Sequence, residues 1–254
     1  MDHLGGSNDL FWVATTRTTD AETDYLAFHH ARVAVMAVRV GANLGYDRTE
    51  QVALGMAGCL FDLGLAGVPA SLLRTAEGLP PSDHALYRDH PRRAAELIRR
   101  WGPHPSIEQA VLHHHERERG QGYQEGLAGA AIHPHAKILG LLDLYTRLTV
   151  PPAWQPPRGP HEAVREIVKS SHDAFTSDLI KALLAEISVF PPGTLVRLST
   201  GETALVLEAN RHQPLRPRVE LVAESKSLRV GGARLLDLSE MPFLSIVGAA
   251  GDGE

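Results

Sequence analysis

The sequence predicts a mostly α-helical domain over residues 24–188, followed by a small antiparallel β module over residues 189–246. Through the first part, apolar residues recur at helical spacing between clusters of Gly and Pro. After Phe190-Pro191-Pro192-Gly193, short runs rich in β-branched residues replace that pattern. Residues 1–23 are expected to form an N-terminal segment, and residues 247–254 a disordered tail.

The helices are predicted from start and stop signals around each apolar stripe. Thr49 can cap the second helix, and Ser106 with Gln109 forms a capping-box pattern at the fourth. Gly102-Pro103 ends the third, because proline cannot continue a helix. In chain order, the predicted helices cover residues 24–44, 49–62, 82–101, 106–116, 132–149 and 161–187.

The β module is predicted from short strands around tight turns. Thr194–Ser199 and Thr203–Leu207 flank Gly201-Glu202, which is a hairpin pattern. Arg218–Val222 and Ser227–Val230 have the composition of two further strands. Strands that follow one another this closely favour antiparallel pairing.

Composition limits the classes of function. The chain has 254 residues and a formal net charge of −5, and its Lys and Arg residues are scattered, which argues against DNA binding. Its single cysteine, Cys59, cannot form a disulfide within the chain, which agrees with a reducing compartment. Met1–Leu10 lacks the pattern of a signal peptide, and no apolar run is long enough to span a bilayer. We therefore expect a cytoplasmic protein.

The doublet His114-His115 is the strongest local sign of a binding site. It follows a short helix whose apolar face includes Ile107 and Val111, so both imidazoles are expected near the core. Burying polar groups without partners costs roughly 1–3 kcal/mol each, and a transition metal would satisfy both rings. Alternatively, one ring points to solvent and the other donates to a backbone carbonyl. The residues alone leave both interpretations open.

Other candidates are weaker when taken singly. Asp143 lies in an apolar run, and a buried carboxylate needs a cation or several donors. His30 can be a hydrogen-bonded core histidine, His90 a helix-terminal residue, and Asp62 an ordinary turn residue. His133 and His135 flank Pro134, and the sequence does not decide whether they lie near the site. By default, these two and the other histidines are expected on the surface or in loops, at positions 3, 29, 84, 104, 113, 133, 135, 161, 172 and 212.

The order of the candidates is more specific than any single residue. Six short blocks carry them: His30-Ala31-Arg32-Val33, Asp62-Leu63-Gly64, His90-Pro91, His114-His115-Glu116-Arg117, Gly120-Gln121-Gly122-Tyr123 and Asp143-Leu144-Tyr145. In this order they closely resemble the HD-GYP family, whose members are bacterial metal-dependent phosphodiesterases that hydrolyse cyclic di-GMP. The resemblance covers about residues 25–187 and implies an HD-domain helical bundle.

The resemblance also implies roles for these residues. One metal would be bound by Asp62, His90, His114 and His115, and a second by His30, Asp62 and Asp143. Asp62 would bridge the two metals and is the expected catalytic residue. Gly122 and Tyr123 are expected to contact the substrate. Iron or manganese is favoured, with zinc or nickel as alternatives.

Several positions depart from the family pattern. Phe61 stands where a metal-binding histidine is expected, and Leu65 replaces a phosphate-contacting lysine. Because these changes remove a ligand and a phosphate contact, we expect about one metal per chain. The other departures are Leu26 for a glutamate, Arg119 for an aspartate, Gln124 for a proline, Thr146 for an aspartate, and the loss of basic residues from Thr149–Pro152.

Three hypotheses follow. We favour a degenerate HD-GYP domain that binds one metal and acts in cyclic di-GMP signalling as a binding or scaffolding module, with a signalling protein as partner or as a homodimer. The second is an active phosphodiesterase that hydrolyses cyclic di-GMP or another phosphoester at an altered site. The third is a structural protein in which the histidines are core polar groups. Metal content separates the third from the others, and turnover separates the first two.

Overall fold

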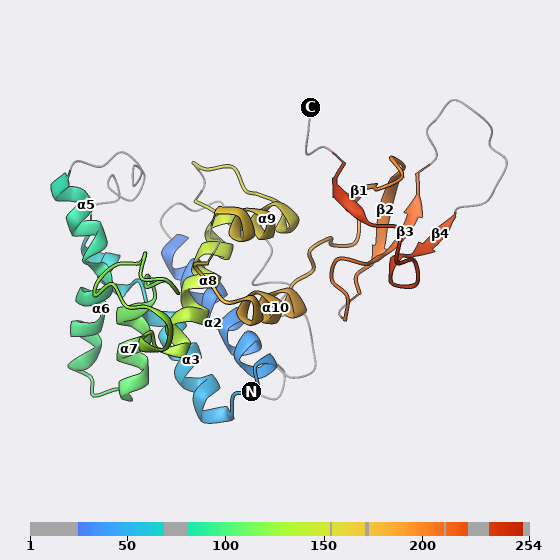
Figure 1. Cartoon of the computed structure of the whole chain (residues 1–254). Helices are drawn as coiled ribbons and strands as arrows, with labels where there is room; N and C mark the ends of the chain where they lie inside the picture. The colour runs from blue at the N-terminus through green and yellow to red at the C-terminus, as the bar shows by residue number, and fades with distance from the viewer. Residues whose placement is uncertain are drawn as a thin grey trace. The chain divides into compact units, whose positions relative to one another are not determined.

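The computed structural model describes residues 25–68, 81–152, 154–170, 173–210, 212–222 and 234–250. The chain divides into two compact units. Unit 1 comprises residues 1–158 and 166–182, and unit 2 comprises residues 159–165 and 183–254. Helices make up most of unit 1 and an antiparallel sheet lies in unit 2 (Figure 1), so the predicted fold class is confirmed. The N-terminal segment predicted for residues 1–23 lies outside the described residues.

Unit 1 is a bundle in which α2, α3, α7 and α8 form the centre. Helix α2 packs against α3 and α8, and α7 packs against α3, α6 and α8. Apolar side chains such as Val33, Leu54, Val111 and Leu139 are fully buried between them. The helices are α2 (Tyr25–Asn43), α3 (Arg48–Leu60), α5 (Pro81–Arg88), α6 (His90–Arg99), α7 (Pro105–His113), α8 (Pro134–Thr149), α9 (Pro160–Ser170) and α10 (Ser177–Glu186), with 3₁₀ helices η2 (Leu63–Gly67) and η3 (Gly129–Ala131).

Two predicted helices are each divided into two. The helix predicted for residues 82–101 is interrupted at Asp89, between α5 and α6. Pro91 has no N–H to donate to the carbonyl of Tyr87, and the Nδ1 of His90 contacts that carbonyl at 2.6 Å instead. The helix predicted for residues 161–187 is divided between α9 and α10, where Asp173 has a left-handed φ of 69°.

Two predicted N-caps are wrong by two residues. Helix α3 is capped by Asp47 rather than Thr49: Asp47 Oδ1 accepts from the N–H of Glu50 at 2.8 Å, and Glu50 Oε2 accepts from the N–H of Asp47 at 2.9 Å. This reciprocal pair is a capping box. At α7, the ring of His104 accepts from the N–H of Ser106, which places Ser106 inside the helix.

Unit 2 contains a five-stranded antiparallel sheet in the order β4-β3-β2-β1-β5. Side chains alternate across it, and Val196, Ala204 and Val219 are fully buried on one face. Gly201 has a φ of 90° in the turn that joins β1 to β2, a conformation that favours glycine. The strands are β1 (Leu195–Leu198), β2 (Thr203–Glu208), β3 (Arg218–Leu221), β4 (Leu235–Asp237) and β5 (Ile246–Ala249), and a short 3₁₀ helix η4 (Leu238–Glu240) follows β4.

The predicted tail begins too early. Strand β5 lies largely within residues 247–254 and pairs with β1, with Val196 opposite Ala249. Without this pairing, β1 would present an open row of backbone donors and acceptors at the sheet edge. The predicted strand Ser227–Val230 and the tail residues 251–254 lie outside the described residues.

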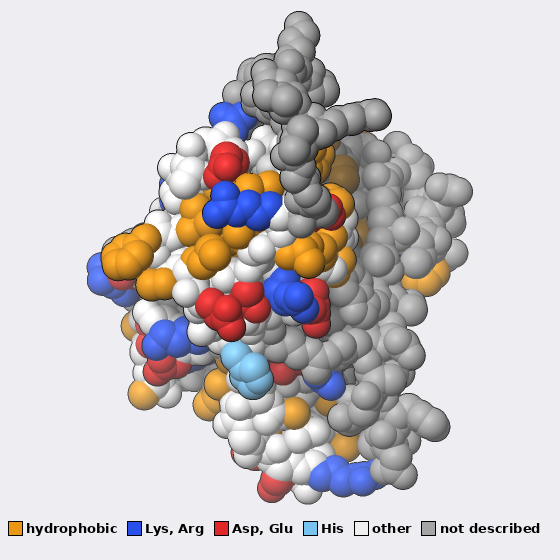
Figure 2. Space-filling view, turned by 90° about the vertical axis from the view of Figure 1, so that its right-hand side faces the viewer, with side chains coloured by type: hydrophobic (Ala, Val, Ile, Leu, Met, Phe, Trp, Pro, Cys, Tyr) orange, Lys and Arg blue, Asp and Glu red, His pale blue; other side chains and the backbone are white. Residues whose placement is uncertain are grey.

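The surface shows no single dominant charge on the face drawn in Figure 2. There, Lys and Arg side chains lie among Asp and Glu, with apolar groups between them. This mixture agrees with a formal net charge of −5. Among the described residues, no helix has both the length and the apolar character needed to cross a membrane.

The capping box yields a test of the local structure. Replacing Asp47 by Ala removes the acceptor for the Glu50 N–H and should lower the free energy of unfolding by about 1 kcal/mol. The matched control is Thr49→Ala, an exposed position inside the helix, which should change stability by less than about 0.5 kcal/mol. Urea unfolding followed by circular dichroism measures both. Equal losses in the two variants would contradict the observed cap.

Candidate metal centre

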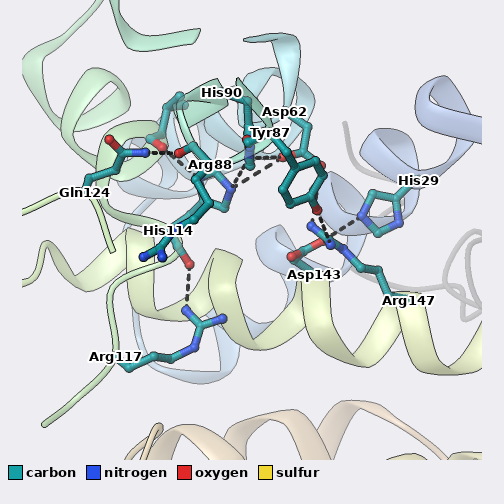
Figure 3. A network of polar contacts seen from close by, with 11 residues as sticks. His29, Asp62, Tyr87, Arg88, His90, His114, Arg117, Gln124, Asp143 and Arg147 are labelled. Carbon is teal, nitrogen blue, oxygen red and sulfur yellow. Dashed lines mark hydrogen bonds and ion pairs between the residues drawn. The ribbon is translucent and has the colours of Figure 1, made fainter. Parts of the chain in front are cut away.

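Side chains from widely separated parts of unit 1 converge on one buried point (Figure 3). Asp62 follows the end of α3, His90 is the first residue of α6, and His114 and His115 follow the end of α7. Helix α8 supplies Asp143 from its middle. The point therefore lies where helix ends meet the side of α8.

Glycines allow these elements to approach closely. A side-chain carbon at Gly64 would collide with the carbonyl of His90, and one at Gly140 would collide with the carbonyl of His114. The family-like blocks around Asp62 and His90 are thus held in contact by the backbone itself. Any larger residue at either glycine would push the segment that carries His90 or His114 away from its neighbour.

Four of these residues form the first candidate ligand group. Asp62, His90, His114 and His115 each offer one atom, and these atoms all lie within 4.8 Å of one another. Asp62 Oδ1 lies 2.9 Å from His90 Nε2 and 3.4 Å from His114 Nε2. All four side chains are buried. Three imidazoles and one carboxylate are a donor set that suits a transition metal.

Backbone contacts fix the orientation of two of the imidazoles. His90 Nδ1 contacts the carbonyl of Tyr87 at 2.6 Å, and His114 Nδ1 contacts the carbonyl of Val111 at 2.7 Å. A carbonyl oxygen can only accept, so each Nδ1 carries a hydrogen and, in the neutral ring, each Nε2 presents a lone pair. The two Nε2 atoms are 3.3 Å apart. Two lone pairs at that distance need a cation between them, either a metal or a shared proton.

His115 completes the group. Its Nε2 is buried and has no hydrogen-bond partner among the described residues. Burial, together with His114 and His90, holds the pKa of His115 well below its usual value, so the ring is neutral. Both imidazoles of the doublet are buried, which excludes the alternative in which one points to solvent. A neutral, unpartnered imidazole beside three other donors fits a metal ligand.

Asp62 is ionised despite its burial. Burial alone would raise the pKa of this carboxyl, but His90, His114 and Arg147 lower it more and hold it well below its usual range. The negative charge of Asp62 is therefore available to a cation at the centre.

The second candidate group is His29, Asp62 and Asp143, and it corrects the predicted ligand His30. His29 Nε2 lies 2.8 Å from Asp143 Oδ1, whereas His30 belongs to neither group. His29 is four residues before Val33 and seven before Met36, so it continues the most buried stripe of α2. His30 is one residue further round the helix, and its ring packs against Phe61.

A basic residue lies inside this second group. Arg147, one turn after Asp143 on α8, places Nε 2.7 Å from Asp143 Oδ1 and Nη2 3.9 Å from Asp62 Oδ2. Its Nη1 donates to the hydroxyl of Tyr87 at 2.8 Å. Burial lowers the pKa of Arg147, but Asp143, Tyr87 and Asp62 raise it more, so it stays charged. Burial raises the pKa of Asp143, but Arg147 and His29 lower it to about 2.

The departures Phe61 and Leu65 are buried apolar side chains. Phe61 is fully buried, and its ring centroid lies 5.1 Å from those of His114 and His30 and 5.7 Å from that of His29. Leu65 is only 4% exposed. Phe61 therefore presents apolar surface to both ligand groups, and neither side chain offers a ligand atom or a hydrogen-bond donor.

The loop that contains Gly122 and Tyr123 lies against the first group. Tyr123 stacks on His115 with ring centroids 4.6 Å apart, and the guanidinium of Arg88 lies over the Tyr123 ring, 4.5 Å from its centroid. Gly122 approaches the backbone of Glu116 so closely that a side chain there would collide with it. Gly122 and Tyr123 are thus placed next to the candidate ligands, and their contact with a substrate stays a prediction.

Glu116 holds this loop in place. Its buried carboxylate accepts backbone N–H groups from Glu125 at 2.7 Å, Gly126 at 3.1 Å and Leu127 at 3.0 Å. Three converging N–H donors satisfy a buried charge without a cation. Glu116 therefore fixes the loop that carries Tyr123 against His115.

Sequence reasoning misplaced several residues. His29, His113 and His135 were expected on the surface, yet all three are buried. His113 and His135 belong to neither ligand group, nor does His133. The roles of Glu116, Tyr87 and Arg147 were missed as well. Only Arg147 had a readable signal, since an arginine four residues after an aspartate on a helix is a favourable pair.

Comparison with known protein families agrees with this geometry. A family model described as "HD domain" matches residues 18–179, and one described as "KOW domain associated with HD domain" matches residues 195–252. The first match covers more than half of the chain and contains both candidate ligand groups.

Curated relatives are named as cyclic dinucleotide phosphodiesterases. The chain is 28% identical over 222 residues to the cyclic di-GMP phosphodiesterase PA4108 of Pseudomonas aeruginosa, which covers 87% of this chain and 52% of that protein. It is 22% identical over 175 residues to the 3'3'-cGAMP-specific phosphodiesterase 3 of Vibrio cholerae, covering 69% and 38%. The chain thus spans about half, or less, of the length of these relatives.

A solved structure supports the fold. The protein described as Bd1817, an HDG"Y"P protein from Bdellovibrio bacteriovorus, matches with a TM-score of 0.60 and 21% identity, covering 71% of this chain and 57% of that one. At this identity the similarity shows a shared fold.

The role of Glu116 can be tested directly. Glu116→Gln leaves one acceptor for three N–H donors and turns an amide toward them, so we expect a loss of about 1–3 kcal/mol in unfolding free energy. Hydrogen exchange should accelerate at the amides of residues 125–127. Glu118→Gln is the matched control, because Glu118 forms only a partly exposed pair with Lys137. Unchanged exchange in Glu116→Gln would show that the carboxylate does not hold the loop.

Proposed function

We propose that this chain, which belongs to the HD domain family in its HD-GYP branch, is a single-metal module of bacterial cyclic di-GMP signalling with impaired hydrolytic activity. In this role it binds a cyclic dinucleotide, or serves as a scaffold for a signalling protein, rather than turning substrate over rapidly. The activities named for the relatives support the ligand class, and the geometry of the centre supports the single metal.

One observation carries the proposal of a metal. The Nε2 atoms of His90 and His114 face each other at 3.3 Å, each with its Nδ1 committed to a backbone carbonyl. A transition metal between them, with Asp62 and His115 as further ligands, satisfies all four side chains at once. Iron or manganese is our first expectation, and zinc or nickel suits the same donors.

The impairment is proposed from what surrounds the other half of the centre. Phe61 supplies apolar surface where the family pattern has a ligand, and Leu65 is buried where the pattern has a phosphate-contacting lysine. A bound metal would supply Lewis acidity toward a phosphate oxygen. The chain's own residues then have to hold the phosphates, and neither Phe61 nor Leu65 can donate to one.

The surroundings of Tyr123 favour binding of a planar group. Its ring stacks on His115 and lies within 4.5 Å of the Arg88 guanidinium, and Glu116 keeps its loop in position. Aromatic and guanidinium planes are surfaces on which nucleobases stack. We infer that Gly122 and Tyr123 form the part of the site that contacts the ligand.

An active phosphodiesterase is the alternative function. A site of three histidines and one aspartate retains the minimum for metal-assisted hydrolysis, and the curated relatives carry the name phosphodiesterase. The substrate would be cyclic di-GMP or another phosphoester. A cytoplasmic location, a signalling protein partner and a homodimer remain predictions from the sequence.

Metal content tests the first half of the proposal. Anaerobically purified protein loaded with Mn²⁺ or Fe²⁺ and then dialysed should hold about one metal per chain by elemental analysis. His115→Ala removes a ligand and should weaken metal binding at least ~10-fold, the loss typical of even an outer-shell partner. His30→Ala is the control, because this histidine belongs to neither ligand group. Two tightly held metals in the parent protein, or none, would contradict the proposal.

Turnover tests the second half. Hydrolysis of cyclic di-GMP should be at least about 100-fold slower than by the Pseudomonas aeruginosa relative under the same metal loading, since losing one preorganised contact costs ~10²–10³ in rate. Binding of cyclic di-GMP, measured by calorimetry on the same preparation, should persist. Turnover within tenfold of that relative would favour the active phosphodiesterase instead.

A further inference from the structure

We propose that the guanidinium of Arg147 is the permanent cation of the His29, Asp62 and Asp143 group and takes the place of a second metal. This inference rests on the proposed single-metal function and deepens it, because it explains why the second group does not bind a metal. The explanation is that Asp143 already forms hydrogen bonds with His29 and Arg147.

Asp143 already binds two N–H donors with one oxygen. Its Oδ1 lies 2.8 Å from His29 Nε2 and 2.7 Å from Arg147 Nε. A carboxylate oxygen has two lone-pair directions, and two N–H donors at these distances occupy both. A metal at Oδ1 would have to approach to about 2.0–2.2 Å, which requires at least one donor to leave.

His29 is held differently from the imidazoles of the first group. A carboxylate can only accept, so the Nε2 of His29 carries a hydrogen toward Asp143. In the first group, His90 Nε2 also lies 2.9 Å from a carboxylate oxygen, that of Asp62, but the Nδ1 atoms of His90 and His114 donate to backbone carbonyls, so a metal can replace a hydrogen on Nε2 while the ring stays neutral. His29 Nδ1 has no hydrogen-bond partner among the described residues, so no backbone acceptor holds the His29 hydrogen on Nδ1 and leaves Nε2 to a metal.

Two nitrogen atoms of Arg147 are held by hydrogen bonds. Its Nε is fixed by Asp143 on the same helix, and its Nη1 donates to the hydroxyl of Tyr87 from α5. Its buried Nη2 makes no hydrogen bond among the described residues and lies 3.9 Å from Asp62 Oδ2. The guanidinium thus reaches both carboxylates of the second group, as a bridging cation would.

Arg147 also supplies the charge that a metal bound beside position 61 would otherwise supply. Phenylalanine at position 61 offers no ligand atom, and the two carboxylates of the second group would still need positive charge. Arg147 supplies that charge from within the chain. A histidine at position 61 alone would therefore meet a fixed positive charge and an engaged Asp143, and should not create a second metal site.

Four proteins test this inference: the parent, Phe61→His, Arg147→Ala and the double variant. Each is loaded with excess Mn²⁺, dialysed and measured by elemental analysis, with thermal unfolding recorded with and without Mn²⁺. We expect one metal in the parent and in Phe61→His, and two in the double variant. Metal-free Arg147→Ala should melt below the parent, and added Mn²⁺ should raise the Tm of the double variant more than that of Phe61→His.

The matched control is Arg158→Gln, which alters an arginine paired with Glu166 and should leave the metal content unchanged. If Arg147→Ala folds poorly, Arg147→Gln keeps hydrogen-bonding groups without the charge and is read in the same way. Two metals in Phe61→His alone, or one in the double variant, would overturn the inference.

Failure of the proposed function would be distinguishable. If the parent binds no metal, that function fails, and the inference is then read from the metal-free protein by a double-mutant cycle of Asp143→Asn with Arg147→Gln. Arg147 as the resident cation predicts that the two changes are coupled by at least tenfold in the unfolding constant. Independent effects would overturn the inference.

Discussion

Two buried carboxylates, Asp62 and Asp143, impose the main constraint on this fold. Both lie in a core where an unpaired charge costs several kcal/mol, so the surrounding elements must deliver positive charge or donors to them. Helices α3 and α7 therefore contact α8, and η2 packs against α6, with Gly140 close to His114 and Gly64 close to His90. Histidines serve Asp62, and Arg147 with His29 serves Asp143.

Local signals predicted the elements but not the exact breaks between them. The stripe of α2 and the hairpin of β1 and β2 follow from residue periodicity, which is a property of adjacent residues. The break before His90 depends on whether its ring replaces a backbone donor, and β5 depends on an edge left open some fifty residues earlier. The first is a side-chain contact with a residue three positions away, and the second is a partner distant in sequence. Apolar periodicity reports neither.

The same limit explains the site. The order of the family-like blocks predicts Asp62, His90, His114, His115 and Asp143 as site residues, and the structure places them in two candidate groups that share Asp62. His29 and His30 are adjacent, and apolar periodicity places a helix face only to within one residue, so it does not decide which of the two lies at the site. Arg147 was missed because its meaning depends on Asp62 and Tyr87, which lie on other elements.

The two candidate ligand groups differ in the cation that they bind, and we expect that Phe61→His alone does not make them equivalent. A site that no longer binds its metal is left with uncompensated carboxylate charge, which destabilises the fold unless another cation enters. Arg147 is placed to be that cation, and its hydrogen bond to Tyr87 ties it to α5, next to the segment that begins with His90. The lost ligand and the internal guanidinium thus form one structural unit. Under the proposed single-metal function, this unit keeps the second carboxylate buried without a second metal, while the four residues of the first group bind one ion.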